Sequence, residues 1–159
     1  MLCAVLLVGC GYSTTELFPT QYQRVTVPNF ENRSSDRDVE FYLREALVKE
    51  IEQRTPYKTA SGTGLSDTQL TGTVVRVDRT LVSRDPSAGL PQENEVTITI
   101  DFDWRDLRTG ETIRGYRGLS AAGQFVPTRV VGEFSNDGIR LAVQRLAQDI
   151  VSRMRDEGW

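Results

Sequence analysis

The chain has 159 residues, and its 19 basic and 22 acidic side chains leave a formal net charge of −3. A net charge this small creates no electrostatic field over the whole molecule that would attract nucleic acid, so we expect no nucleic-acid partner. Histidine is absent, which removes the commonest general base and the commonest zinc ligand and argues against Ser-His-Asp hydrolases and zinc enzymes. Because no motif assembles a nucleophile with its base or a cradle for a cofactor, the sequence predicts neither an enzyme nor a cofactor.

The first feature along the chain is an apolar run that ends in Leu7-Val8-Gly9-Cys10. This pattern resembles the lipobox of bacterial lipoproteins, in which a peptidase cleaves after a slim residue and the cysteine thiol takes up a diacylglycerol. We therefore expect residues 1–9 to be a signal peptide and Cys10 to be the lipidated residue. No Lys or Arg precedes the apolar run, which predicts that the natural start lies upstream of Met1. The alternative is a short apolar strand with an ordinary buried thiol at Cys10.

Residues 11–21 are polar and rich in turn-forming residues, so residues 10–21 are predicted to be a lipidated tether. Residues 22–159 then form a single domain, because this length suits one compact core. Cys3 lies in the predicted signal peptide and Cys10 would be acylated, so no disulfide is expected and the core alone must hold the fold.

The first half of the domain predicts one strand and one helix. Residues 24–28 place Val25 and Val27 on one face of a short strand that Pro28 ends. Residues 29–36 read as a loop in which Ser35 or Asp36 caps the following helix. Over residues 37–54 the apolar side chains recur every three or four residues, which is one stripe of an amphipathic helix. Residues 60–67 then form a Gly/Ser/Thr connector.

The second half predicts three strands and a helix. Residues 70–82 read as a strand whose apolar phase changes between Val74 and Val75, which indicates a β-bulge. A hairpin loop at residues 83–91 leads to the clearest strand, in which every second side chain from Val96 to Trp104 is apolar. After a turn at residues 106–111, residues 112–125 form a strand that places Ile113, Gly115, Leu119, Ala121 and Phe125 on one face. Following a loop at residues 126–134, Ser135 caps the last helix, whose apolar stripe is Ile139, Ala142, Val143, Leu146, Ala147, Ile150, Val151 and Met154.

The predicted order is strand-helix-strand-strand-strand-helix. The fold class is therefore α+β, with a four-stranded, mostly antiparallel sheet and two helices packed on one face. The alternation in the third strand indicates that the other face is open to water.

Two sets of charged residues are candidate sites. Asp101 and Asp103 share one strand face at a spacing of about 7 Å, which suits paired catalytic carboxylates or a hard metal ion. The plainer interpretation is a solvated face on which they pair with Arg114 and Arg76. A second set would form a basic rim for an anionic ligand, and scattered surface arginines are the equally weighted alternative; its members are Arg76, Arg79, Arg84 and Arg129.

The chain as a whole resembles the LptE family of lipopolysaccharide-assembly lipoproteins. The stretches that carry the resemblance are Gly9-Cys10-Gly11-Tyr12, Val25-Thr26-Val27-Pro28, Phe30-Glu31-Asn32-Arg33, Leu70-Thr71-Gly72-Thr73-Val74, Gly89-Leu90-Pro91-Gln92-Glu93 and Asp106-Leu107-Arg108-Thr109-Gly110-Glu111. The resemblance implies a lipoprotein held at the periplasmic side of the outer membrane by the lipid on Cys10. Gly11 stands where an inner-membrane retention signal would have Asp, which agrees with that location.

The resemblance also implies partners and site residues. The folded part of the protein would plug and help to assemble LptD, the β-barrel of the lipopolysaccharide translocon. It would also assist lipopolysaccharide insertion into the outer leaflet. By position in two loops, Arg84 and Arg129 correspond to the lipopolysaccharide-binding basic residues of the family. Two other hypotheses remain open. One is an anchored lipoprotein that scaffolds another envelope complex without binding lipopolysaccharide, and the other is a periplasmic enzyme built on Asp101 and Asp103.

Overall fold

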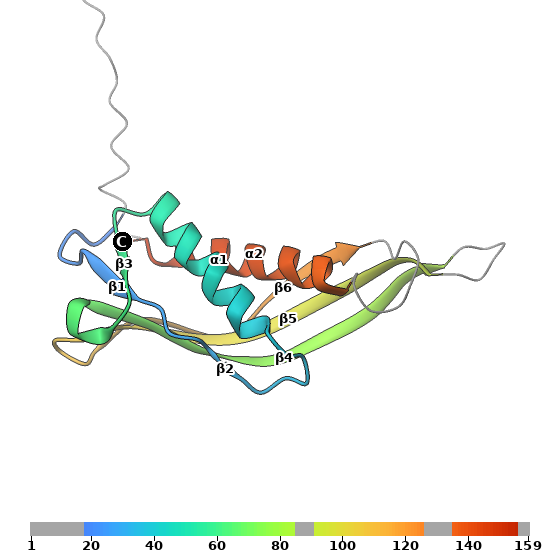
Figure 1. Ribbon diagram of the computed structural model, residues 1–159, viewed down its shortest axis with the longest axis horizontal. Coiled ribbons are helices and arrows are strands. Elements are labelled where there is room, and N and C mark those ends of the chain that lie inside the picture. The colour runs from blue at the N-terminus through green and yellow to red at the C-terminus, as the bar shows by residue number, and fades with distance from the viewer. Residues whose placement is uncertain (1–17, 85–90, 126–134, 156–159) are drawn as a thin grey trace, which may run out of the picture.

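The computed structural model describes residues 18–84, 91–125 and 135–155. Two helices cover one face of a mixed sheet, and the opposite face is open (Figure 1). In chain order the elements are β1 (Arg24–Thr26), β2 (Glu31–Asn32), α1 (Val39–Arg54), β3 (Lys58–Ala60), a 3-10 turn (Thr63–Leu65), β4 (Thr68–Arg84), β5 (Pro91–Asp106), β6 (Thr112–Phe125) and α2 (Ser135–Arg153). The predicted α+β class is confirmed.

The sheet has six strands, and the prediction of a four-stranded, mostly antiparallel sheet is wrong. Its order is β3-β1-β4-β5-β6, with β2 also pairing along β4. β1 runs parallel to β3 and β4, and β2 runs parallel to β4, whereas β4, β5 and β6 are antiparallel. The two strands that the sequence did not reveal, β2 and β3, contain two and three residues. Strands this short show no alternation and are stabilised by pairing with their neighbours.

The two helices are arranged differently on the sheet. α2 packs directly over β5 and β6, whereas α1 packs mainly against α2 and reaches the sheet near β2 and β3 (Figure 1). Their apolar stripes meet the core-facing side chains of the sheet, and every residue of the predicted α2 stripe is buried. Within the described part of the chain, neither helix is long and apolar enough to cross a membrane.

The clearest predicted strand is confirmed. Val96, Ile98, Ile100, Phe102 and Trp104 of β5 all lie in the core, at 1 % exposure or less. The predicted bulge in β4 is also present, because the pairing register with β5 shifts between Val74 and Arg76. β4 and β5 are both longer than expected, because Arg84 still pairs with Pro91. The residues at the two ends of the predicted hairpin loop, 83–91, therefore belong to the strands.

β6 contains a bulge that the sequence analysis missed. The register with β5 shifts between Ile100 and Phe102, and Gly118 adopts a positive φ of 69° opposite this shift. The extra residue reverses the inward-outward phase of the strand. Gly115 therefore pairs with Asp103 on the open face rather than joining Leu119 in the core, and its predicted placement is wrong.

The entry to α1 also differs from the prediction. The helix begins at Val39, and neither Ser35 nor Asp36 caps it. The preceding residue, Asp38, has a φ of 68° and makes no capping bond through its side chain. Asn32 of β2 instead holds this segment, because its amide donates hydrogen bonds of 2.7 Å to the Asp36 carbonyl and 2.6 Å to the Glu40 carboxylate. The start of α1 is thus held to β2 by the side chain of Asn32 and not by a capping residue of the helix.

Candidate functional site

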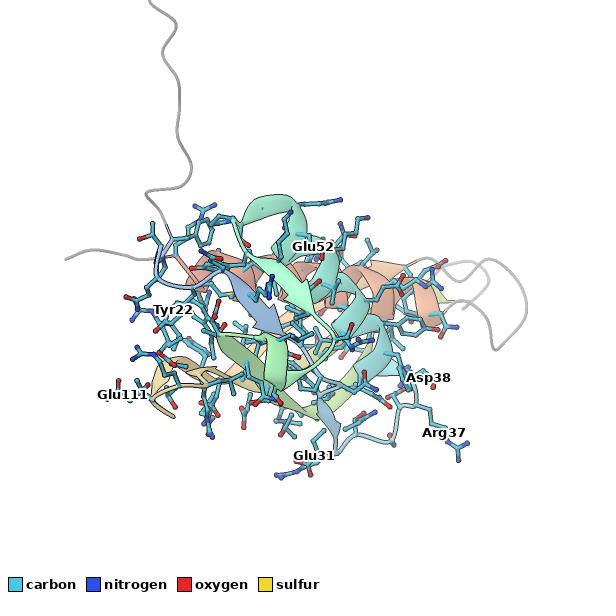
Figure 2. The ribbon with its side chains drawn as sticks, turned by 60° about the vertical axis from the view of Figure 1, so that its left-hand side comes forward. Tyr22, Glu31, Arg37, Asp38, Glu52 and Glu111 are labelled. Carbon is cyan, nitrogen blue, oxygen red and sulfur yellow. The ribbon has the colours of Figure 1, made fainter. Side chains whose placement is uncertain are left out.

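The open face of the sheet carries polar side chains along most of the paired length of β4 and β5. Register pairing places the side chains of this face on every second residue of β4 and β5, opposite the core positions. They are Gln69, Thr71, Thr73, Arg76, Asp78 and Thr80 of β4, with Glu95, Thr97, Thr99, Asp101, Asp103 and Arg105 of β5. Figure 2 shows Glu31 of β2 projecting on the side of the sheet away from the helices. We call this surface the open polar face.

The two candidate carboxylates lie on this face but do not form a reactive pair. Asp103 accepts hydrogen bonds of 3.0 and 2.9 Å from one guanidinium nitrogen of Arg117, and Arg105 lies 3.8 Å from the same carboxylate. Asp101 accepts a 2.7 Å bond from the backbone N–H of Gly118. Each carboxylate is held by its own donors, which leaves neither poised to act on a substrate.

The predicted partners of these carboxylates are wrong. Arg76 pairs with Asp78 of its own strand at 2.8 Å, and Arg117 takes the place predicted for Arg114. The β6 bulge explains the exchange of Arg114 for Arg117, because it carries Arg117 to the level of Asp103. Within the described residues no group of three or more Cys, Asp or Glu side chains could hold a metal ion. In the structure, Asp101 and Asp103 serve as acceptors for donors from β6 on the surface of the sheet.

A second charged group on the open polar face comes from the Phe30-Glu31-Asn32-Arg33 stretch. The Arg33 guanidinium donates two hydrogen bonds, of 3.0 and 3.1 Å, to the Glu31 carboxylate. These bonds lower the pKa of Glu31, which keeps this exposed carboxyl ionised. The Thr73 hydroxyl approaches the same carboxylate at 3.5 Å. The sequence analysis used this stretch for the family resemblance only, although Glu31 and Arg33 share an i, i+2 spacing that places them on one side of an extended chain.

The four arginines of the predicted basic rim are not one surface. Arg79 faces the helix layer, where it forms a two-pronged ion pair with Asp36, and the hydrogen bonds raise the pKa of its guanidinium. Arg76 lies on the open polar face, opposite Thr99. Two members of the proposed rim thus lie on opposite faces of the sheet, and each is already paired with a carboxylate.

The remaining predicted site residues lie at or beyond the limits of the described chain. Arg84 is the last residue of β4 and pairs with Pro91, so it extends a strand and does not lie in a loop as predicted. Arg129 lies outside the described residues, in the segment between Phe125 and Ser135. Phe125 pairs with Asn94, which is three residues, or about 10 Å, from Pro91 along β5. Arg84 and Phe125, the last described residue before the segment that contains Arg129, therefore belong to the same end of the sheet. Cys10 also lies outside the described residues.

At the other end of the molecule, Asp106 organises the turn between β5 and β6. Burial opposes ionisation of its carboxyl, but hydrogen bonds from the backbone N–H groups of Arg108 and Thr109 and from the Tyr22 hydroxyl outweigh burial and lower its pKa. Burial, in turn, raises the pKa of Tyr22. The predicted turn at residues 106–111 is confirmed, and it closes with a positive φ at Gly110.

Comparison with solved structures shows that this fold recurs in other bacterial proteins. The PelC dodecamer from Paraburkholderia phytofirmans matches with a TM-score of 0.54 and 12% sequence identity, over 87% of this chain and 92% of that chain. A hypothetical protein from Chlamydia trachomatis matches with a TM-score of 0.57 and 11% identity, over 83% of this chain and 95% of that chain. At such low identity these likenesses show the fold alone. No protein with a curated description matches the sequence significantly.

A family model gives the assignment that structural likeness alone does not. The model described as "LptE: Lipopolysaccharide-assembly" matches residues 22–154. This range runs from Tyr22, beside the turn held by Asp106, to Met154 in the core at the end of α2. It thus includes every strand and both helices of the structure. The chain therefore belongs to the LptE lipopolysaccharide-assembly family.

Proposed function

We propose that this chain is an outer-membrane lipoprotein whose domain plugs the LptD β-barrel, helps to assemble it and assists lipopolysaccharide insertion into the outer leaflet. In this proposal the lipid on Cys10 anchors the protein on the periplasmic side, and the domain has no catalytic role. Family membership supports the general task, lipopolysaccharide assembly. The observation that carries the more specific role is the open polar face, because it lies on the side of the sheet opposite both helices.

An open polar face suits the inside of an outer-membrane barrel. The interior wall of such barrels is polar and hydrated, whereas the outside carries an apolar band. A plug in that environment gains from exposed hydroxyl and charged groups and would be destabilised there by a large exposed apolar face. Thr71, Thr73, Asp101 and Asp103 supply such groups. The ion pairs of Asp103 with Arg117 and of Glu31 with Arg33 limit the net charge of the open polar face.

Site-specific photo-crosslinking in the native envelope tests the barrel contact. A photoreactive amino acid at Thr97, on the open polar face, should capture an outer-membrane barrel protein that mass spectrometry identifies as LptD. The same amino acid at Leu141, which is 44 % exposed on α2, serves as the control for random encounters. We expect a yield from Thr97 several times that from Leu141. Capture of a different envelope protein from Thr97 would support the scaffolding alternative and overturn the barrel role.

We further propose that Arg84 and Arg129 contribute to lipopolysaccharide binding. The lipopolysaccharide headgroup carries phosphates and carboxylates, and arginine binds such groups through strong charge-assisted hydrogen bonds. Support comes from the position of Arg84 at the end of the sheet where Phe125, four residues before Arg129 in the sequence, also lies.

The double variant Arg84→Ala, Arg129→Ala should bind lipopolysaccharide at least tenfold more weakly, since each contact is worth about 1.5–3 kcal/mol. Arg76→Ala is the matched control, because Arg76 lies on the same strand but is paired with Asp78. The free energy of unfolding should change by less than about 0.5 kcal/mol in the double variant. Equal affinity of the double variant and the wild type would remove both arginines from the ligand site.

A further inference from the structure

Leu65 is the most exposed of the large apolar side chains in the described residues, at 68 %. It ends the 3-10 turn Thr63–Leu65, between β3 and β4, and a Cβ placed on Gly62 or Gly64 would meet no atom within 4 Å. The turn therefore stands away from the rest of the domain. A single exposed leucine is ordinary on a protein surface. Leu65 is of interest because its turn lies close to the N-terminal residues of the domain.

The described chain begins beside this turn. Gln21 and Tyr22 line the same hollow, of about 350 Å³, as Thr63 and Ser66. Asp67, just after the turn, accepts hydrogen bonds of 2.8 and 2.9 Å from the backbone N–H groups of Gln23 and Arg24. In Figure 1 the segment between β3 and β4 lies at the same end of the molecule as the start of the coloured chain. The turn and the first described residues thus lie at the same end of the domain.

That end is fixed to the core by an aromatic cluster. Phe18 is 3 % exposed and packs edge-on against Tyr57 at 5.8 Å between ring centroids. The Tyr57 hydroxyl donates a 3.0 Å hydrogen bond to the Pro19 carbonyl. Seven residues lie between Cys10 and Phe18, so the two are eight Cα–Cα steps apart, which span at most about 28 Å. A lipid on Cys10 would therefore hold this end of the domain close to the membrane surface.

The chemistry around Leu65 suits such a surface. Residues 55–66 contain one charged side chain, the exposed Lys58, and the carboxylate of the following Asp67 is bound by the backbone N–H groups of Gln23 and Arg24. Apolar side chains that insert into the bilayer and cations that meet anionic headgroups are two contributions that bind a protein segment to a membrane surface.

We propose that the Thr63–Leu65 turn is a second membrane contact, in which Leu65 inserts into the phospholipid leaflet that holds the lipid of Cys10. The proposal rests on the lipid anchor of the proposed function. It assigns the turn to a bilayer surface of phospholipid and not to the barrel partner, and it directs the β4–β5 hairpin away from that leaflet.

Fluorescence quenching in vesicles tests the contact. The lipidated protein carries an environment-sensitive fluorophore on an encoded azido amino acid at Thr63 and is reconstituted in vesicles of phosphatidylethanolamine and phosphatidylglycerol with spin-labelled headgroups. We expect quenching at Thr63 to be at least threefold stronger than at Leu141, the matched exposed leucine position on α2. Equal quenching at the two positions in these barrel-free vesicles would overturn the proposal and leave Leu65 to a protein contact.

A substitution separates the effect of Leu65 from that of the tether. With the fluorophore still at Thr63, Leu65→Asp should reduce quenching to the level of the α2 position. Undiminished quenching would show that the tether alone holds the turn at the surface, which would overturn the role of Leu65. Intact mass first establishes whether Cys10 is acylated. If its thiol is free, coupling Cys10 to a maleimide lipid restores the tether, so that a failed lipid anchor and a failed Leu65 contact give different results.

Discussion

Gly123 of β6 lies directly against Gly138 of α2. A Cβ placed on Gly123 would stand 2.1 Å from the Gly138 carbonyl oxygen and 2.8 Å from the Ala142 nitrogen. Both obstacles belong to the helix backbone, which cannot move aside as a flexible side chain can. This contact sets how closely the N-terminal half of α2 approaches the sheet, and it requires a residue without a side chain on β6.

Gly123→Ala is therefore expected to destabilise the domain. Forcing a methyl group into a tightly packed contact costs about 1–3 kcal/mol, because the helix must shift away from the sheet. Gly62→Ala is the matched control, since nothing lies within 4 Å of its Cβ position and its backbone is extended. Chemical denaturation of the two variants measures the difference. An equal free energy of unfolding for both would show that α2 is free to move at this point.

Substitutions in β5 test the two faces of the sheet. Ile98→Asp should unfold the domain, because Ile98 is fully buried and an unpaired buried charge costs several kcal/mol. Thr97→Asp, on the open polar face, should be tolerated. Thr99→Asp should fall between them, because Thr99 is only 8 % exposed and its hydroxyl has no hydrogen-bond partner. Thermal melts rank the three variants, and loss of folding with Thr97→Asp would show that the second face is buried too.

Thr99 illustrates where sequence reasoning reached its limit. Alternation correctly identified the core residues from Val96 to Trp104, because every second side chain of a strand points to the same face of the sheet. Alternation also placed Thr99 on the face that we call the open polar face, and the pairing register agrees. It could not show that the neighbours of this central position shield it from water. Shielding depends on the tertiary neighbours of a residue and not on its own spacing.

The bulge at Gly118 explains two of the errors. One inserted residue in β6 moves Gly115 to the open polar face and brings Arg117, rather than Arg114, to Asp103. The sequence signal was a glycine within a strand, which often marks a bulge, yet β6 contains three such glycines. The bulge in β4 was predictable because two adjacent valines broke the apolar phase. In β6 no apolar pair marks the break.

The ion pair of Asp103 and Arg117 should contribute little to stability. Asp103 is 20 % exposed and Arg117 61 % exposed at the side chain, and pairs of this kind contribute about 0.2–1 kcal/mol in double-mutant cycles. The cycle Asp103→Asn, Arg117→Gln measures this coupling by chemical denaturation at low and high salt. We expect a coupling below 1 kcal/mol that shrinks with salt. A value of several kcal/mol would mean that the pair holds the sheet together and is not a solvated part of the open polar face.

Asp106 is expected to make the stability of the domain depend on pH. Its folded-state pKa lies below the ordinary value of about 3.9, because the N–H groups of Arg108 and Thr109 and the Tyr22 hydroxyl stabilise the carboxylate. A group with a lowered pKa binds more protons in the unfolded state than in the folded state over the interval between its two pKa values. Its contribution is therefore fully present above the unfolded pKa and is lost as pH falls towards the folded one.

Denaturation of the wild type and of Asp106→Asn from pH 6 to pH 2.5 should show this effect. The wild type should be the more stable above about pH 5, a pH clear of the ordinary carboxyl pKa, and the difference should narrow as the solution becomes more acidic. Tyr22→Phe is the control, because it removes one donor from Asp106 and leaves the two backbone donors in place. It should keep most of the pH dependence. If Asp106→Asn instead follows the wild type at every pH, the turn between β5 and β6 does not depend on the charge of Asp106, and its backbone hydrogen bonds alone hold this end of the domain.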